Sequence, residues 1–420
     1  MIHLSSLSEV KIISKKNYFS STPDQVWYFL LASCLWGFAA ATSDAIFNNY
    51  LSENFKISNL QRMLIEVPRE IPGLIVIFVT VLFSFLCTRR LAAVAMLFAA
   101  LGTLLLAVAT PNFKFMLLWL FIMSIGQHIL LPTSSAIGMQ LAREGETGKR
   151  LGQFNGARNF AAIIGSLSIF IGFKFFNFNF SVAFLLSTAS YLGASFFLLK
   201  MKPVEKQKAS LKLKLYKEYR LYYWLTILFG ARKQIFLTFA PWVLVTVFNQ
   251  PTTMIATLLT IGGVIGIGFQ PLIGRCIDKI GERFILASEA FVLIFVCLGY
   301  GFAKQLFSEK TAFLIAATCY ILDLLLMSVG MARATYLKKI AISPSHIPST
   351  LAMATSIDHI FSIGAAILCG ILWKFFGYQS VFFLAGTIAL VNLFSALKIQ
   401  IPAVTGLPAV VVLSPEKVAS

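Results

Sequence analysis

Long hydrophobic runs, separated by short polar connections, occupy most of the sequence. Each run has about 18 or more residues, which is close to the length that a helix needs to cross a bilayer. A segment in lipid must also satisfy its own backbone hydrogen bonds, as a helix does. The pattern therefore predicts an all-α polytopic membrane protein with twelve transmembrane helices. Their approximate bounds are 26–51, 60–87, 91–110, 114–142, 151–175, 180–201, 221–248, 252–276, 284–303, 312–337, 349–376 and 380–397.

The composition supports this class. Of the 420 residues, 58% are hydrophobic and 12% are charged, whereas soluble proteins carry about 25% charged residues. A net charge of +18 would suggest a nucleic-acid partner in a soluble protein. Here most of the positive charge lies in the connections, where a positive-inside bias explains it and no nucleic acid is needed. The six cysteines contain no CxxC pair, so we expect neither a disulfide framework nor a metal site.

The basic residues divide unevenly between alternate connections, which predicts the orientation. If both termini are cytoplasmic, Lys and Arg are far more numerous inside than outside, as the positive-inside rule requires. We therefore expect a multi-pass protein of a bacterial inner membrane, whose basic cytoplasmic loops contact anionic lipid. The inside would hold the basic connector 202–220 together with Lys11, Lys15, Lys16, Arg89, Arg90, Arg143, Lys149, Arg150, Arg275, Lys279, Arg283, Lys338 and Lys339. The outside would hold Lys56, Lys114, Lys174, Lys304, Lys310 and Lys374.

Short sequence matches in a shared order indicate an internal repeat. MSIG at 123–126 returns as MSVG at 327–330, and Ile46-Phe47 returns as Ile235-Phe236. The stretches 151–158 and 351–358 open equivalent spans. Such a six-plus-six duplication is one way in which transporters build a central site. We predict a cytoplasmic N-terminal segment (1–25), two pseudo-symmetric six-helix bundles (26–201 and 221–398), a basic linker (202–220) and a cytoplasmic tail (399–420).

A loop after the eighth span carries a family motif. Residues 274–283 read GRCIDKIGER, which resembles the G-x-x-x-D-[RK]-x-G-x-[RK] loop of the major facilitator superfamily. In that family the loop Asp holds the cytoplasmic ends of neighbouring helices together. The resemblance therefore implies gating roles for Gly274, Asp278, Gly281 and Arg283. Asp278 could accept hydrogen bonds from a helix N-terminus or from nearby arginines.

The resemblance extends to other parts of the chain. The equivalent first-half loop, 87–91, keeps a basic pair but lacks the Asp and both glycines. Certain bacterial members are also similar around FNNYL (47–51) and EVPREIPG (66–73). The family implies that spans 1, 4, 7 and 10 line a central cavity and that the two bundles rock to give alternating access.

Two adjacent cations in the middle of the seventh span are the main candidate chemistry. Arg232 and Lys233 lie inside an apolar run, and a cation at the bilayer centre costs roughly 2.5–3.5 kcal/mol on insertion scales. They should face a water-filled cavity, a carboxylate or an anionic ligand. We predict substrate contacts from Arg232, Lys233, His128, Gln127 and Asn48. His128 could instead be a hydrogen-bonded interior residue or a proton carrier.

Further charges within the spans form a predicted proton and charge network of Asp44, Glu66, Arg69, Glu70 and Asp323. Glu66 and Glu70 share a helix face, where they could fix a kink with Arg69 or act in transport. The repeat aligns Asp44 with Lys233, which makes them a possible pair, with Glu70 or Asp323 as competing partners. Glu289 is the least persuasive acid, because its span tends to be peripheral in the family.

Arg158 and Asp358 occupy equivalent places in the two halves and are further gating candidates. A bridge between them across the halves would close the inner mouth. Each could equally be satisfied within its own half, for example Asp358 by Arg333. The sequence leaves both alternatives open.

Several motifs that would indicate other classes of function are missing from the sequence. The sequence has no GxxxxGK[ST] loop, HExxH pair or nucleophile elbow, so we expect neither an ATP-driven pump nor an enzyme, and no cofactor. We predict a monomeric, proton-coupled secondary transporter of a small anionic or zwitterionic solute, working by a rocker switch. Efflux of amphipathic drugs or lipids is an alternative. A non-transporting receptor or scaffold on the same fold is another.

Overall fold

The computed structural model describes residues 22–55, 65–203 and 215–401. The first half contains α2 (Pro23–Phe55), α4 (Glu66–Leu82), α5 (Thr88–Val108), α6 (Phe113–Gln140), α7 (Thr147–Phe175) and α8 (Phe180–Lys200). The second half contains η1 (Lys217–Tyr219), α9 (Arg220–Thr246), α10 (Thr252–Ile280), α11 (Glu282–Leu306), α12 (Glu309–Leu326), η2 (Met327–Val329), α13 (Gly330–Ile340), α14 (His346–Phe376) and α15 (Tyr378–Leu397).

These elements confirm the predicted all-α, twelve-span organisation, since α12, η2 and α13 together make one span. Within the described residues, ten helices are long and apolar enough to cross a membrane. The other two are α4, which has 17 residues, and α9, which contains Arg232 and Lys233. The large exposed side chains include many Phe and Leu residues, which is the surface that a lipid-embedded bundle presents.

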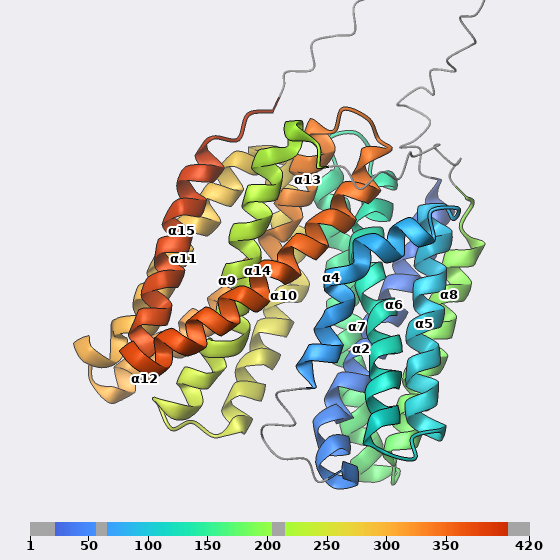
Figure 1. Ribbon diagram of the computed structural model, residues 1–420, viewed down its shortest axis with the longest axis horizontal. Coiled ribbons are helices and arrows are strands. Elements are labelled where there is room, and N and C mark those ends of the chain that lie inside the picture. The colour runs from blue at the N-terminus through green and yellow to red at the C-terminus, as the bar shows by residue number, and fades with distance from the viewer. Residues whose placement is uncertain (1–21, 56–64, 204–214, 402–420) are drawn as a thin grey trace, which may run out of the picture.

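The two halves stand side by side (Figure 1). In the first half α5 packs on α6 and α8, and α2 packs on α7 and α8. In the second half α11 packs on α15 and α12, and α14 packs on α9. Both described chain ends lie at the same end of the bundle, at the top of Figure 1. We call this end the terminal side; it is the side that the sequence predicts to be cytoplasmic.

Contacts between the halves run along two seams. On one seam α7 packs against α10, and on the other α4 and α6 pack against α14. Small residues make the first seam close: a Cβ added at Gly148 would lie 2.3 Å from the Gly274 carbonyl oxygen, and one added at Gly274 would lie 2.2 Å from the Gly148 carbonyl oxygen. Helices in membranes use small residues to approach in this way.

The tenth span is interrupted where the second copy of the repeat lies. MSIG continues the regular α6, whereas MSVG forms the 3₁₀ turn η2 and then Gly330 begins α13. A short 3₁₀ segment within a long helix often marks a functional hinge. The Sδ of Met327 in η2 lies 3.2 Å from Arg232 Nη1, so the irregular turn lies against one of the candidate cations.

Candidate functional site

A cavity between the halves contains one of the two predicted cations. Its volume is about 540 Å³, and its lining comes from both halves. Lys233 of α9 and Arg158 of α7 lie about 20 Å and 16 Å from the terminal-side ends of their helices at 1.5 Å per residue. The cavity therefore lies between the middle of the bundle and the terminal side. Its polar and charged lining residues include Ser33, Ser134, Ser135, Asn155, Arg158, Thr226, Lys233, Gln270, Ser328, Arg333, Thr355 and Asp358.

Lys233 forms an ion pair with Asp358 at the cavity wall. The Lys233 Nζ donates to Asp358 Oδ2, and the two side chains are 20% and 14% exposed. The other carboxylate oxygen, Asp358 Oδ1, has no hydrogen-bond partner among the described residues. This pair holds α9 and α14 together within the second half. It replaces the predicted Asp44–Lys233 pair, which the structure does not form.

Two arginines in the cavity lie against aromatic rings. The Arg158 guanidinium carbon is 4.4 Å from the centre of the Trp36 ring, and that of Arg333 is 3.5 Å from the centre of the Phe229 ring. Within the described part of the chain, neither arginine has a carboxylate within ion-pair distance. The bridges that the sequence suggested from Asp358 to Arg158 or to Arg333 are therefore absent here. The cavity holds three cations and one carboxylate.

Arg232 is not part of the lining of this cavity, so the structure does not place the two adjacent cations at one site. Its side chain is 3% exposed, and its Nη2 donates to Asp323 Oδ1 at 2.5 Å. Its Nη1 lies 3.7 Å from Glu289 Oε1. Two buried carboxylates thus flank one guanidinium among α9, α11 and α12. Glu289, which the sequence analysis set aside because of its span, belongs to this cluster.

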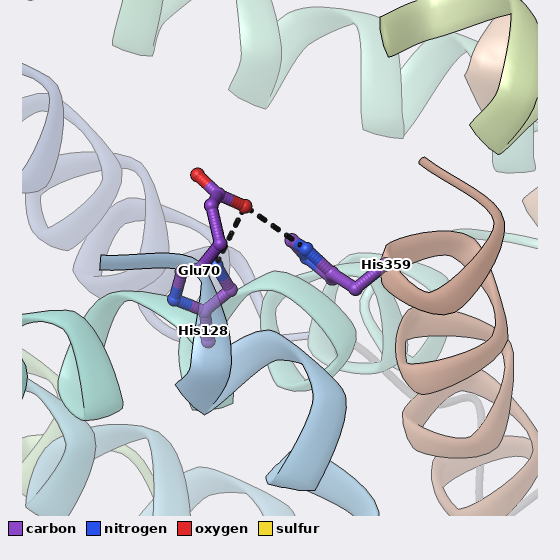
Figure 2. A group of neighbouring side chains, drawn as sticks. All are labelled: Glu70, His128 and His359. Atoms are coloured by element: carbon purple, nitrogen blue, oxygen red, sulfur yellow. Dashed lines mark ion pairs between the residues drawn. The ribbon is translucent and has the colours of Figure 1, made fainter. Parts of the chain in front are cut away.

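A third charged cluster joins the two halves (Figure 2). Glu70 Oε2 of α4 lies 3.0 Å from His359 Nδ1 of α14 and 4.0 Å from His128 Nε2 of α6. The two imidazole rings meet edge to face, with centroids 4.8 Å apart. His128 is 8% and His359 5% exposed. The sequence predicted Glu70 and His128 as separate features and gave His359 no role, although it follows Asp358 directly.

The remaining candidates of the first half bond within that half. Arg69 Nη2 lies 3.3 Å from Asp44 Oδ1, and Gln127 Nε2 donates to the Tyr191 hydroxyl at 3.0 Å. Neither Gln127 nor His128 lines the cavity that Lys233 borders, although Lys233 is close enough to His128 to act on it electrostatically. Asn48 and Glu66 are on α2 and α4, but their side chains fall outside the part of the chain that the structure describes.

The motif loop connects the halves on the terminal side. Asp278 at the end of α10 accepts hydrogen bonds from the backbone N–H groups of Gly148 and Lys149, both at 2.7 Å. These groups lie in the first turn of α7. Of the two partners that the sequence suggested for Asp278, the structure therefore shows the helix N-terminus and not the arginines. Gly281 ends α10 with a φ of 96°, a conformation that favours glycine. Arg283 is exposed and its neighbour Glu282 is buried.

Two lysines on α13, which the sequence places among the cytoplasmic loop charges, make further terminal-side contacts. Lys338 Nζ lies 2.9 Å from the Met139 carbonyl oxygen and 3.0 Å from Thr147 Oγ1, so it bonds to α6 and α7 across the halves. Lys339 Nζ lies 2.8 Å from the buried Glu282 Oε1. The spacing of the motif does not predict these contacts, because α13 follows it by about fifty residues.

Known structures share this arrangement of helices. FucP, a major facilitator superfamily transporter solved in the outward conformation, matches with a TM-score of 0.71 and 15% identity, over 88% of this chain and 97% of that chain. The human organic anion transporter MFSD10 matches with a TM-score of 0.69 and 13% identity, over 90% and 100%. The proton:xylose symporter XylE matches with a TM-score of 0.65 and 16% identity, over 88% and 94%. At these identities the matches establish the fold alone.

Sequence comparison assigns the family. No curated protein matches the chain. The family model described as the Major Facilitator Superfamily matches residues 71–341, which is more than half of the chain and includes the motif loop. The twelve-span bundle is therefore a multi-pass membrane protein of a transporter family, and this chain belongs to the Major Facilitator Superfamily.

Proposed function

We propose that this protein is a secondary active transporter of a small organic anion, which binds in the cavity between the halves. The observation that carries the proposal is the charge of that cavity. Arg158, Lys233 and Arg333 line it together with a single carboxylate, Asp358. An anion would offset the excess of positive charge, and arginine binds carboxylate and phosphate groups through paired hydrogen bonds.

Alternating access fits the way in which the cavity is bounded. Its lining comes from both halves, so a rotation of one half against the other would change its access. On the terminal side, Asp278 and Lys338 hold the halves together through hydrogen bonds. These contacts would have to break before the cavity could open to that side, as a rocker switch requires.

Proton coupling is supported by the buried cluster of Arg232, Asp323 and Glu289. Among the described residues, Arg232 is the one guanidinium within ion-pair distance of both carboxylates, and Arg333 acts on Glu289 from beyond that distance. A single close cation leaves two buried carboxylates incompletely compensated, and an uncompensated charge is costly in a buried site. A bound proton would remove the excess negative charge. The other titratable side chains near Asp323 are Tyr300, Tyr320, Cys297 and Cys319, and Tyr and Cys are ordinarily neutral near pH 7. The Asp323–Glu289 pair is therefore the proposed proton carrier.

The aromatic part of the cavity lining refines the substrate class. Phe29, Trp36, Phe154, Tyr222 and Phe229 all line the cavity. Rings beside the cations would contact an apolar portion of the substrate, so an amphipathic anion fits better than an inorganic one. This observation also favours the second candidate function, efflux of amphipathic compounds. The direction of transport distinguishes the two.

The proposal can be tested first by ligand-induced stabilisation. The purified protein would be heated with a library of carboxylates, phosphates, sulfonates, zwitterions and neutral sugars. A ligand at 100 times its dissociation constant stabilises the folded state by about 2.7 kcal/mol, which raises the midpoint of thermal unfolding. Organic anions should raise it for the wild type and fail to do so for Arg158→Gln. Lys310→Gln is the matched control, because Lys310 is an exposed outer-side cation away from the cavity.

Active compounds would then be followed into proteoliposomes with an imposed proton gradient. Glu289→Gln should keep exchange of labelled for unlabelled substrate but lose accumulation driven by the gradient, since exchange needs no net proton movement. Stabilisation by neutral sugars alone, or an unchanged response of Arg158→Gln, would exclude an anion site at the cavity. A non-transporting receptor would bind the same anions but carry out neither exchange nor accumulation.

A further inference from the structure

Glu70, His128 and His359 form a cluster that the proposed transport mechanism does not use. They come from α4, α6 and α14, so two belong to the first half and one to the second (Figure 2). One ligand atom from each lies within 4.8 Å of the others. The sequence predicted no metal site, because it offered no cysteine pair and because these three residues lie far apart along the chain.

The contacts of His128 fix its tautomer. Its Nδ1 lies 2.9 Å from the carbonyl oxygen of Ser124, which can only accept a hydrogen bond. The Ser124 hydroxyl donates to the Arg69 carbonyl oxygen, so it too is an acceptor toward the ring. Nδ1 therefore carries the proton, and neutral His128 turns the lone pair of Nε2 toward Glu70 Oε2, 4.0 Å away. Two acceptors face each other there, and a cation between them would bind both.

The His359 imidazole packs directly against Gly73, which has no side chain to occupy that space. A Cβ added at Gly73 would lie 2.4–2.6 Å from three atoms of the His359 imidazole, so any other residue at position 73 would displace the ring. Nδ1 then lies 3.0 Å from Glu70 Oε2. Among the described residues, Lys233 also acts on Glu70, but it is already paired with Asp358. Little positive charge is therefore left to repel a bound cation.

We propose that Glu70, His128 and His359 bind one divalent transition-metal ion, of the Zn²⁺ class, at the junction between the halves. A ligand set of two imidazoles and one carboxylate favours such ions over Mg²⁺ or Ca²⁺, which prefer oxygen ligands alone. With bonds of about 2.1 Å, neighbouring ligand atoms of a tetrahedral ion are about 3.4 Å apart. The two separations from Glu70 Oε2, 3.0 and 4.0 Å, bracket this value, and all three ligand atoms lie within 4.8 Å of one another. The Glu70 side chain is 39% exposed, which leaves room for a water as fourth ligand.

The site has a conformational consequence because its ligands come from both halves. A metal ion can keep all three only while α14 stays beside α4 and α6, as in this structure. Binding therefore stabilises this arrangement of the halves over any in which they separate at that seam. The inference does not depend on the anion cavity or on the direction of transport.

The test is equilibrium metal binding to the tag-free, full-length protein in detergent. Co²⁺ serves as the probe, because its visible absorption reports nitrogen and oxygen ligands in low-symmetry coordination, and Zn²⁺ should displace it. We expect one Co²⁺ per chain. Loss of even an outer partner of a metal ligand lowers affinity roughly 10- to 100-fold, so Glu70→Gln, His128→Ala and His359→Ala should each weaken binding by more than about 100-fold.

His346→Ala is the matched control, since it removes an imidazole that stacks on Tyr216, in contacts other than those of the cluster. It should bind Co²⁺ like the wild type. The absence of a Co²⁺ spectrum in the wild type would overturn the proposal and leave a shared proton as the occupant of the cluster. Binding that survives in all three ligand variants would overturn it as well. The wild-type measurement decides the question even if a variant fails to fold, and no outcome depends on a transport substrate.

Discussion

Arg232 and Lys233 are adjacent in the sequence but lie in two different regions. Arg232 is enclosed with Asp323 and Glu289 inside the second half, and its side chain is 3% exposed. Lys233 borders a cavity of about 540 Å³ and is paired with Asp358. Consecutive residues of a helix point about 100° apart, because each turn takes 3.6 residues. A pair of cations in one span therefore need not serve one site.

The difference between the two regions concerns how charge is balanced. In the buried cluster two carboxylates flank one cation, and in the cavity three cations share one carboxylate. The first is a dry site with an excess of negative charge that suits a proton. The second has an excess of positive charge that suits an anion. Because Arg232 and Lys233 lie on different faces of α9, one helix contacts both regions.

The largest effect should follow from Arg232→Gln. The change leaves Asp323 and Glu289 buried without their cation, and loss of one partner of a buried ion pair costs about 3–5 kcal/mol. We expect the free energy of unfolding in mixed detergent to fall by that amount. Glu289→Gln is the control within the cluster: it leaves a one-to-one pair of Arg232 with Asp323 and should change stability by less than about 1 kcal/mol. Equal losses in the two variants would contradict the proposed imbalance.

Lys233→Gln should have the next largest effect, on binding rather than on stability. A hydrogen bond to a charged group contributes about 1.5–3 kcal/mol, so the affinity for a cavity-bound organic anion should fall roughly 10- to 100-fold. Isothermal titration with an anion found by thermal stabilisation would measure it. Because the Lys233 side chain is 20% exposed, the free energy of unfolding should fall much less than in Arg232→Gln. An unaltered affinity would remove Lys233 from the binding site.

The sequence predicts the architecture well because hydrophobic run length determines it. The family and the order of the helices can be predicted from three features: twelve hydrophobic runs, a repeat between the halves and the GRCIDKIGER loop. The cost of placing polar groups in lipid makes such runs nearly unambiguous. The partner of Asp278 followed in part from the same logic, since a helix N-terminus attracts a carboxylate.

Side-chain partners could not be predicted in the same way. Alignment of the repeats paired Asp44 with Lys233, yet each has a closer partner: Arg69 for Asp44 and Asp358 for Lys233. Partner choice depends on helix rotation about its axis, and a hydrophobic run on all faces gives no amphipathic pattern that would reveal that rotation. The cluster at Glu70 was missed for this reason, because α4, α6 and α14 meet only in three dimensions.

Asp278→Asn should have an intermediate effect, on the equilibrium between conformations. The carboxylate accepts from two backbone N–H groups with its two oxygens, whereas an amide has one oxygen and turns an NH₂ group toward the other donor. Losing one such bond at the α7 N-terminus should weaken terminal-side closure by about 1–2 kcal/mol. Cysteines introduced along Gly156 and Asn155 in a cysteine-free background should then label faster from the terminal side. Unchanged labelling would remove Asp278 from the gate.

The smallest expected effect has the opposite sign and tests the comparison most directly. In Asp358→Asn the cavity loses the one carboxylate that lines it among the described residues, so Lys233 is no longer held by a partner of the protein and can turn to a substrate. Because Lys233 already contributes to anion binding while it is paired, we expect a gain no larger than that of a typical hydrogen bond, about 0.5–1.5 kcal/mol net. Anion affinity should therefore rise about two- to tenfold in the titration used for Lys233→Gln. The double variant Lys233→Gln/Asp358→Asn should lose this gain, because the released cation is absent. Asp358→Asn could instead weaken anion binding and destabilise the fold as Arg232→Gln does. In that case both ion pairs would serve stability, and the Lys233–Asp358 pair would be structural like the buried one.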